Sequence, residues 1–232
     1  MMENSQLLAP EETIQAEINS WLENSLPAST PWRKQQLGIF LNQGFPTRKN
    51  EEYKYTGIDA FIKRNITSVA IPPTTLAPAE VEKSFVKETG HHLVFVNGRY
   101  EQSLSSLSND DALALKEVED HELLNQVADP TDPLIALNSA AHPNALFLEV
   151  AKNKKALPVF AYHFLSNGAE YLISPRMIVH AHEGASLDVV HRTICQNSQN
   201  VLINGVTEIT VHPNASVNFS RLQHYNDQVF EV

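Results

Sequence analysis

Two histidines placed two residues apart are the first residues in this sequence whose types and spacing could do chemistry. His180 and His182 form an H-x-H pair, and in a β-strand such side chains point to the same face. Two imidazoles on one face could chelate a divalent metal ion. Both, however, occupy the polar positions of an alternating segment, opposite its apolar residues. We therefore interpret them as solvent-facing strand residues and predict no metal ligands.

A thiol and an imidazole lie four residues apart further along the same segment. His191 and Cys195 share the odd-numbered positions of Val189, and such a pair could bind a soft metal or form an activated thiolate. A buried, unreactive cysteine is the commoner outcome, so we assign no catalytic role here. Cys195 is the only cysteine, which excludes an intrachain disulfide and a multi-cysteine cluster site within this chain.

Residues 48–56 mix basic and aromatic side chains, a combination that could stack on nucleobases. Two interleaved glutamates argue against this, and we expect Tyr53 and Tyr55 to pack on a neighbouring element. The sequence has no Walker loop, no GxGxxG after a strand, no GxSxG and no HExxH. It therefore predicts a protein that is not an enzyme, without catalytic or cofactor-binding residues.

Charge and composition narrow the classes of partner. Seventeen Lys and Arg stand against 27 Asp and Glu among 232 residues, a formal net charge of −10 that opposes binding to nucleic acid or an anionic membrane. The first residues do not resemble a signal peptide, and no run of about 18 apolar residues occurs. We expect a globular, cytoplasmic protein without nucleic-acid or membrane partners.

The histidines and the cysteine discussed above lie in or beside an internal repeat, which must position them. Residues 179–189 align with residues 209–219, thirty positions later, and the odd-numbered positions of both copies are apolar. These positions, expected to share one core, are Val179, Ala181, Ala185, Leu187, Val189, Ile209, Val211, Ala215, Val217 and Phe219. Each copy reads as strand, two-residue corner and strand, so the repeat predicts stacked coils of a β-helix, or failing that a jelly roll.

Several helices, a β-hairpin and further strands are predicted N-terminal to the repeat. We expect helices over 10–27, from Pro31 to a stop at Gly44, over 79–89, over 110–127 and over 134–141, with a linker at 67–78. Asn97 and Gly98 predict a β-hairpin turn. Strands dominate from residue 145. The fold class is therefore α+β, with a helical and mixed region at 1–144 and a parallel β-helix beginning at 145–232.

Residues 45–56, FPTRKNEEYKYT, resemble a signature of the SufB/SufD family of Fe-S cluster assembly scaffold proteins, most closely its SufD branch. Later segments are similar to successive landmarks of that family, in the same order. They are residues 93–105, 136–138, 174–190 and 203–223. The resemblance therefore extends over nearly the whole chain.

The resemblance implies a right-handed parallel β-helix and a non-catalytic subunit of a SufBCD-type complex. Its partners would be SufB-like and SufC-like (ATPase) subunits, with a homodimer as a further assembly. A transient Fe-S cluster would belong to the assembled complex, with no cofactor in the isolated chain. Family members are longer, so we expect this chain to be an N-terminal part that stops at Val232 within the β-helix. No family cluster ligand maps onto it.

Two other classes of protein remain as alternatives. A cupin-like or jelly-roll metal-binding protein would use His180 and His182, but its ligands must face into the barrel. A carbohydrate-acting β-helix enzyme needs clustered carboxylates on one outward strip, and Asp188 aligns with Asn218 instead of a second acid.

Overall fold

The computed structural model of the chain describes residues 20, 30–58, 62, 76–119, 122–166, 169–195 and 199–232. The described part is mixed α and β, with few helices and mostly parallel sheets. Its helical segments are α2 (Pro31–Gln43), η1 (Glu51–Tyr53), α4 (Pro78–Glu82), η2 (Gln102–Leu104) and α5 (Pro133–Ala141). Its strands are β1 (His91–Val96), β2 (Arg99–Tyr100), β3 (Leu113–Val118), β4 (Ala145–Val150), β5 (Val159–Leu165), β6 (Ala169–Ile173), β7 (Arg176–Ala181), β8 (Ser186–Cys195), β9 (Gln199–Ile203), β10 (Val206–Val211), β11 (Ser216–His224) and β12 (Val229–Glu231).

From β4 onward the chain visits three sheets in turn. The sheets have the strand orders β11-β8-β5-β1-β2, β10-β7-β4-β3 and β12-β9-β6. Each set of three consecutive strands, β4–β6, β7–β9 and β10–β12, therefore forms one layer, which we call a tier. Strands of successive tiers pair in parallel, and Ser216 lies beside Ser186 and Ile209 beside Val179. The thirty-residue offset predicted from the sequence is confirmed for these strands.

The largest core cluster fills the space between the first two sheets. Val179, Ala181, Ala185, Leu187 and Val189 are buried in it, and Ile209, Ala215, Val217 and Phe219 pack against it. The prediction of one shared core is confirmed for these nine positions. It is wrong for Val211, which is 46% exposed. Val211 ends β10, an outer strand that has no neighbour on its far side among the described residues.

The predicted corners adopt a conformation that suits their residues. Gly184 and Asn214 have φ values of 68° and 60°, in the left-handed region that glycine and asparagine tolerate best. The Gly184 N–H donates to the Pro213 carbonyl, which joins the corners of two tiers. A Cβ on Gly184 would lie 2.3 Å from the Asn153 side-chain oxygen, so a larger residue there would displace the Asn153 amide.

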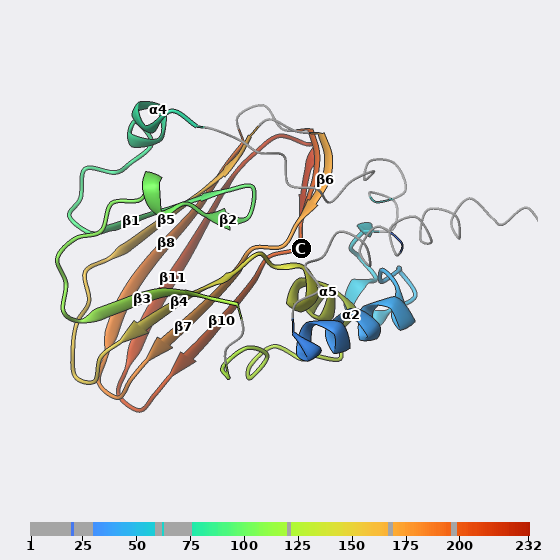
Figure 1. Ribbon diagram of the computed structural model, residues 1–232, viewed down its shortest axis with the longest axis horizontal. Helices are drawn as coiled ribbons and strands as arrows, with labels where there is room; N and C mark the ends of the chain where they lie inside the picture. The colour runs from blue at the N-terminus through green and yellow to red at the C-terminus, as the bar shows by residue number, and fades with distance from the viewer. Residues whose placement is uncertain are drawn as a thin grey trace, which may run out of the picture.

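The hairpin and two of the helices are confirmed. Asn97 and Gly98 connect β1 to antiparallel β2 with φ values of 48° and 85°. Helix α2 begins after Thr30, whose hydroxyl accepts from the Arg33 N–H, and Asp132 caps α5 in the same way. The two helices pack together on one side of the molecule, away from the corners of the tiers (Figure 1).

Two predicted helices differ from the structure. The helix over 110–127 is wrong: residues 113–118 form β3, which pairs antiparallel with β4 and places Leu115 beside Leu148. Leu113 and Leu115 pack against the core at a spacing of two residues, which suits a strand. The helix over 79–89 ends early, at Glu82 in α4. Phe85 instead turns inward to pack among aromatic residues.

Other predictions lie partly or wholly outside the described residues. The helix over 10–27, except residue 20, and the linker up to residue 75 belong to these. The domain division at residues 144 and 145 stays a prediction, although β1 to β3 extend the sheets that later strands form. Within the described part of the chain, no helix combines the length and apolar character needed to span a membrane.

Candidate functional site

Three histidines gather where β7 and β10 end. His180 lies near the end of β7, His182 follows that strand, and His212 follows β10. The parallel register places Thr210 beside His180, so the next polar position, His212, lies beside His182. The three residues offer ring nitrogens that lie within 4.8 Å of one another. The structure thus adds a third imidazole, from a different strand, to the H-x-H pair.

The imidazoles of this histidine trio are closely stacked. His180 and His212 have ring centroids 4.8 Å apart, and their Nε2 atoms are separated by 2.7 Å. The His180 and His182 rings are stacked at 4.5 Å. At 2.7 Å one Nε2–H donates to the other Nε2, so at least one ring nitrogen presents a lone pair to its neighbour.

A carboxylate and an open cleft adjoin the trio. Glu149 of β4 lies 2.9 Å from Nε2 of His182, and their side chains are 36% and 40% exposed. Both residues line a surface cleft of about 450 Å³, together with Asp110, Asp111 and Lys152. The arrangement combines nitrogen and oxygen donors beside a solvent-accessible space. Such groups can bind a cation or exchange protons with solvent.

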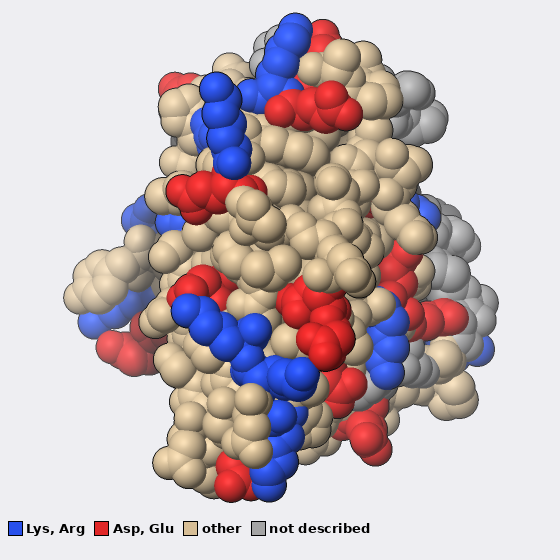
Figure 2. Space-filling model, turned by 90° about the vertical axis from the view of Figure 1, so that its left-hand side faces the viewer, with Lys and Arg blue, Asp and Glu red and all other residues tan. Residues whose placement is uncertain are grey.

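The surface near the corners of the tiers carries both signs of charge. Figure 2 shows a run of basic side chains down the lower part of this face, flanked by acidic side chains. Lys152 pairs with Glu183 at 2.6 Å, and Lys154 pairs with Asp111 at 3.0 Å. Two lysines near these corners are therefore paired with acidic side chains.

The structure does not bring His191 and Cys195 together. His191 is buried, with its ring 6.2 Å from that of His163 and 6.4 Å from that of Phe219. Cys195 is half-buried and packs against a different cluster, which contains Leu165. The two residues therefore have separate surroundings, and an activated thiolate would need a base from elsewhere.

His163 and His191 are buried and held neutral. Burial, together with the nearby His191 and Arg221, lowers the pKa of His163 to about 3. Burial and Arg221 lower the pKa of His191 to about 4. The Gly98 N–H donates to Nε2 of His163 at 2.8 Å, so that nitrogen is the acceptor. These residues therefore act as neutral packing groups near pH 7.

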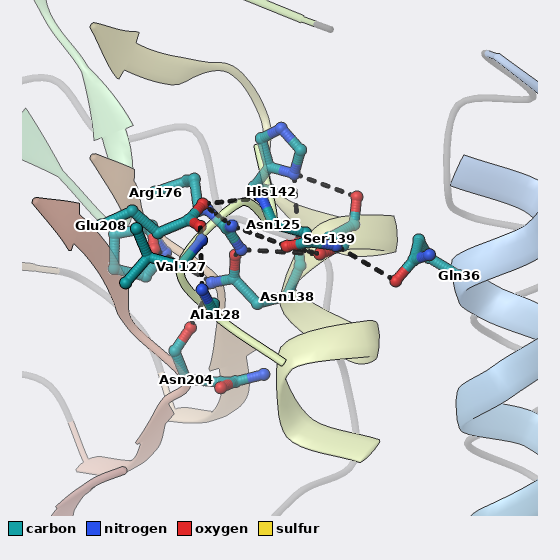
Figure 3. Close-up of polar contacts among 11 residues, drawn as sticks. Gln36, Asn125, Val127, Ala128, Asn138, Ser139, His142, Arg176, Asn204 and Glu208 are labelled. Carbon is teal, nitrogen blue, oxygen red and sulfur yellow. Dashed lines mark hydrogen bonds and ion pairs between the residues drawn. The ribbon is translucent and has the colours of Figure 1, made fainter. Parts of the chain in front are cut away.

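A buried ion pair joins the second and third tiers. Arg176 of β7 and Glu208 of β10 are both almost fully buried and lie in direct contact (Figure 3). The Glu208 carboxylate also accepts from the N–H groups of Asn125, Val127 and Ala128 at 2.9 to 3.0 Å. Burial alone would raise the pKa of Glu208, but these hydrogen bonds and the Arg176 charge lower it overall.

Helix α5 is tied to the same place. Arg176 donates to the side-chain oxygen of Asn138, and Asn138 donates to the carbonyls of Pro175 and Asn204 at 3.0 and 2.7 Å. Asn204 in turn donates to the Leu134 carbonyl at 2.8 Å. This network, which we call the polar junction, fixes α5 against the starts of β7 and β10. Its side chains bond to one another and to nearby carbonyls, so it is a structural joint.

The cluster at residues 48–56 separates into two kinds of residue. Tyr53 packs against the core beneath α2 and donates to Asp132 at 2.7 Å, as its predicted packing role requires. Burial and this carboxylate raise the pKa of Tyr53. The packing prediction is wrong for Tyr55, which is 93% exposed. Lys54 Nζ lies 5.7 Å from the centroid of the Tyr55 ring, but the ring stays almost fully open to solvent.

Sequence reasoning missed His212, Glu149 and the polar junction. The repeat contained a signal for His212, because His182 and His212 occupy the same position in the two copies. Glu149 could be placed beside the pair only after the register of β4 against β7 was known. The cupin-like alternative gains no support from this geometry, because Val179 and Ala181 point into the core and His180 points to the opposite, outward face of a mostly parallel sheet.

Comparisons with known proteins match most of the chain. Residues 12–157 match the family model described as SufBD protein N-terminal region. Residues 164–232 match the model described as SUF system FeS cluster assembly, SufBD core domain. The chain is also 23% identical over 201 residues to the iron-sulfur cluster assembly protein SufD of Escherichia coli (strain K12). That alignment covers 85% of this chain and 47% of the relative, so the chain spans about half the relative's length.

Proposed function

Because this chain belongs to the SufB/SufD family and is SufD-like, we propose that it serves as a non-catalytic scaffold subunit in Fe-S cluster assembly. Its partners in this proposal are a SufB-like subunit and a SufC-like ATPase, in the cytoplasm. The observation that carries the proposal is the ordered match of both family models, which together extend from residue 12 to residue 232. We infer the non-catalytic role from family membership.

The proposed architecture of the scaffold is a right-handed parallel β-helix. Three strands per tier, parallel pairing between tiers and the thirty-residue register support it. Parallel crossovers are right-handed in nearly all proteins, which supports the handedness. In this proposal the three tiers are successive coils, and the Gly184 corner stacks on the corner that contains Pro213.

A scaffold must transmit a displacement from one partner to another. The core of the tiers is close-packed with branched aliphatic side chains, and such interiors pass strain on instead of absorbing it. The polar junction extends this rigid body to α5, and α5 packs on α2. A movement imposed by an ATPase on one end would therefore be felt across the described part of the chain.

The cluster itself is proposed to belong to the assembled complex. Fe-S clusters are usually held by several cysteine thiolates, and this chain contains one cysteine, which is half-buried. The remaining ligands would then come from a partner. The proposal includes no nucleic-acid or membrane partner.

Co-purification tests the proposed assembly. The 232-residue chain would be co-expressed with tagged SufB-like and SufC-like subunits from the same source, and the complex would be sized by light scattering after gel filtration. We expect the chain to elute with both partners in a fixed ratio. Matched variants are Leu187→Ala, which weakens the core, and the adjacent surface change Ser186→Ala. A folded chain that elutes apart from both partners would contradict the proposal.

A further inference from the structure

The histidine trio has no part in the proposed scaffold role, which depends on the core and on partner surfaces. We propose that His180, His182 and His212, supported by Glu149, bind one divalent first-row transition-metal ion of the Zn²⁺ class on the outer face of β7 and β10. The site would join two successive tiers, because His180 and His182 come from one tier and His212 from the next. This inference stands independently of the proposed function.

The nitrogen atoms are close to the positions that a metal ion requires. Zn–N bonds of about 2.0 to 2.1 Å in a tetrahedral site place two ligand nitrogens roughly 3.3 Å apart. The Nε2 atoms of His180 and His212 are 2.7 Å apart, and the three residues offer donors within 4.8 Å of one another. Small rotations of the His180 and His212 side chains would increase the distance between their Nε2 atoms to the required value. No movement of the strands is needed.

Glu149 gives the trio an orienting partner. His182 donates through Nε2 to the Glu149 carboxylate at 2.9 Å. Hydrogen bonds from metal-binding histidines to carboxylates fix the ring and raise the basicity of its free nitrogen. Glu149 is therefore a positioning residue for His182, and its negative charge also offsets the charge of the cation.

The surroundings allow a cation to enter. His180 and His182 are half-buried and His212 is exposed, so the rings are held by neighbours yet remain in reach of solvent. The adjoining cleft carries the carboxylates of Asp110 and Asp111, and Asp111 is paired with Lys154 at 3.0 Å. Its lysine, Lys152, is paired with Glu183 at 2.6 Å. The local charge therefore favours a cation over an anion.

The donor set selects the class of metal. Imidazole nitrogens favour Zn²⁺, Ni²⁺, Cu²⁺ and Fe²⁺, whereas Mg²⁺ and Ca²⁺ prefer sites made of oxygen atoms. Each bound ion would fasten the corner of the third tier to that of the second. Since the ion binds only the folded arrangement, it would also raise the melting temperature with concentration.

The test uses the tag-free 232-residue chain and Zn²⁺ alone, measured by calorimetry and by thermal melting. We expect one ion per chain, a rise in melting temperature and no comparable effect of Mg²⁺. His212→Ala is the main variant because this side chain is exposed and its loss should not disturb folding. It and His180→Ala should each weaken binding by tenfold or more, as should Glu149→Gln.

The matched control is His224→Ala, an exposed histidine at the other end of β11, which should bind Zn²⁺ like the wild type. Co²⁺ provides a second readout, because a tetrahedral nitrogen site gives visible d–d absorption that His212→Ala should abolish. Absence of stoichiometric binding would overturn the proposal. So would binding that persists unchanged in His212→Ala, or that His224→Ala weakens equally.

Discussion

The apolar core of the tiers and the polar junction beside α5 are both buried, but different forces hold them. The core contains side chains such as Leu187 and Val179, whose burial is favourable in almost any packing that fills space. In the polar junction, Arg176 and Glu208 depend on particular hydrogen bonds. In the core, the loss of unfolding free energy should therefore grow with the number of atoms that a mutation removes. In the junction, removing any one partner should cause a large loss, because the remaining groups stay buried without their hydrogen bonds.

Removing one charge of the junction should have the largest effect. Arg176→Met leaves the Glu208 carboxylate buried without its cation, which should cost about 3 to 5 kcal/mol of unfolding free energy. Denaturant unfolding measures this loss. The double variant Arg176→Met with Glu208→Leu removes both charges and should recover a large part of it. A single variant as stable as the wild type would show that the junction is no more directional than the core.

A cavity in the core should have a slightly smaller effect. Leu187→Ala removes three buried heavy atoms of the central cluster and should cost about 2 to 5 kcal/mol, depending on how far neighbours relax. The adjacent Ser186→Ala, on the opposite face of β8, should stay within about 0.5 kcal/mol of the wild type. The same denaturant titration compares the two. Equal losses would mean that odd-numbered and even-numbered positions do not differ in burial.

Acid should destabilise the chain through its buried histidines. Burial lowers the pKa of His142 and His163 to about 3 and that of His191 to about 4, below the ordinary value of 6.5. The unfolded chain therefore binds protons more readily, and stability falls as pH drops from about 6.5 towards 4. The slope is up to about 1.4 kcal/mol per pH unit for each histidine.

The pH dependence can be assigned with a pair of variants. His191→Leu removes one of these groups. The slope of unfolding free energy against pH between 6.5 and 4 should therefore decrease by the contribution of about one proton. Melting at a series of pH values records it. His224→Leu replaces an exposed histidine and should leave the slope unchanged. If neither variant altered the slope, His191 would not contribute to the loss of stability in acid.

Self-association through the outer strands should be the smallest effect, and it should depend on protein concentration. Val211 and Leu222 are exposed large apolar residues on β10 and β11, the outer strands of their sheets. Exposed strand edges favour association between chains. We expect the chain to self-associate in light scattering at high concentration, and Val211→Lys with Leu222→Lys to reduce this. A wild type that stays monomeric throughout would contradict the expectation.

Local sequence patterns were sufficient for the repeat and insufficient elsewhere. Alternation between Val179 and Val189, with Gly184 at the corner, fixes strand, face and turn within a few residues. The strand β3 depends on its partner β4, which lies about thirty residues away, so its leucines were equally compatible with a helix. Partner-dependent pairing of this kind cannot be judged from one segment.

The candidate site shows the same division. His180 and His182 were recognisable as a pair because they are neighbours in sequence. His212 joins them only through the parallel register of β10 and β7, and Glu149 through that of β4 and β7. The polar junction was missed because Arg176 and Glu208 belong to no sequence motif. Their partners are mainly backbone groups and amides, which carry little sequence signal.

We propose above all that this chain is a scaffold whose cluster depends on partner subunits. Anaerobic loading with iron and sulfide, followed by iron and labile-sulfide analysis after gel filtration, tests it most directly. We predict no stable cluster on the chain alone and a stoichiometric cluster on the complex with SufB-like and SufC-like subunits, because one cysteine cannot supply the usual thiolate ligands. A stoichiometric cluster on the isolated chain, lost in Cys195→Ser, would contradict the account.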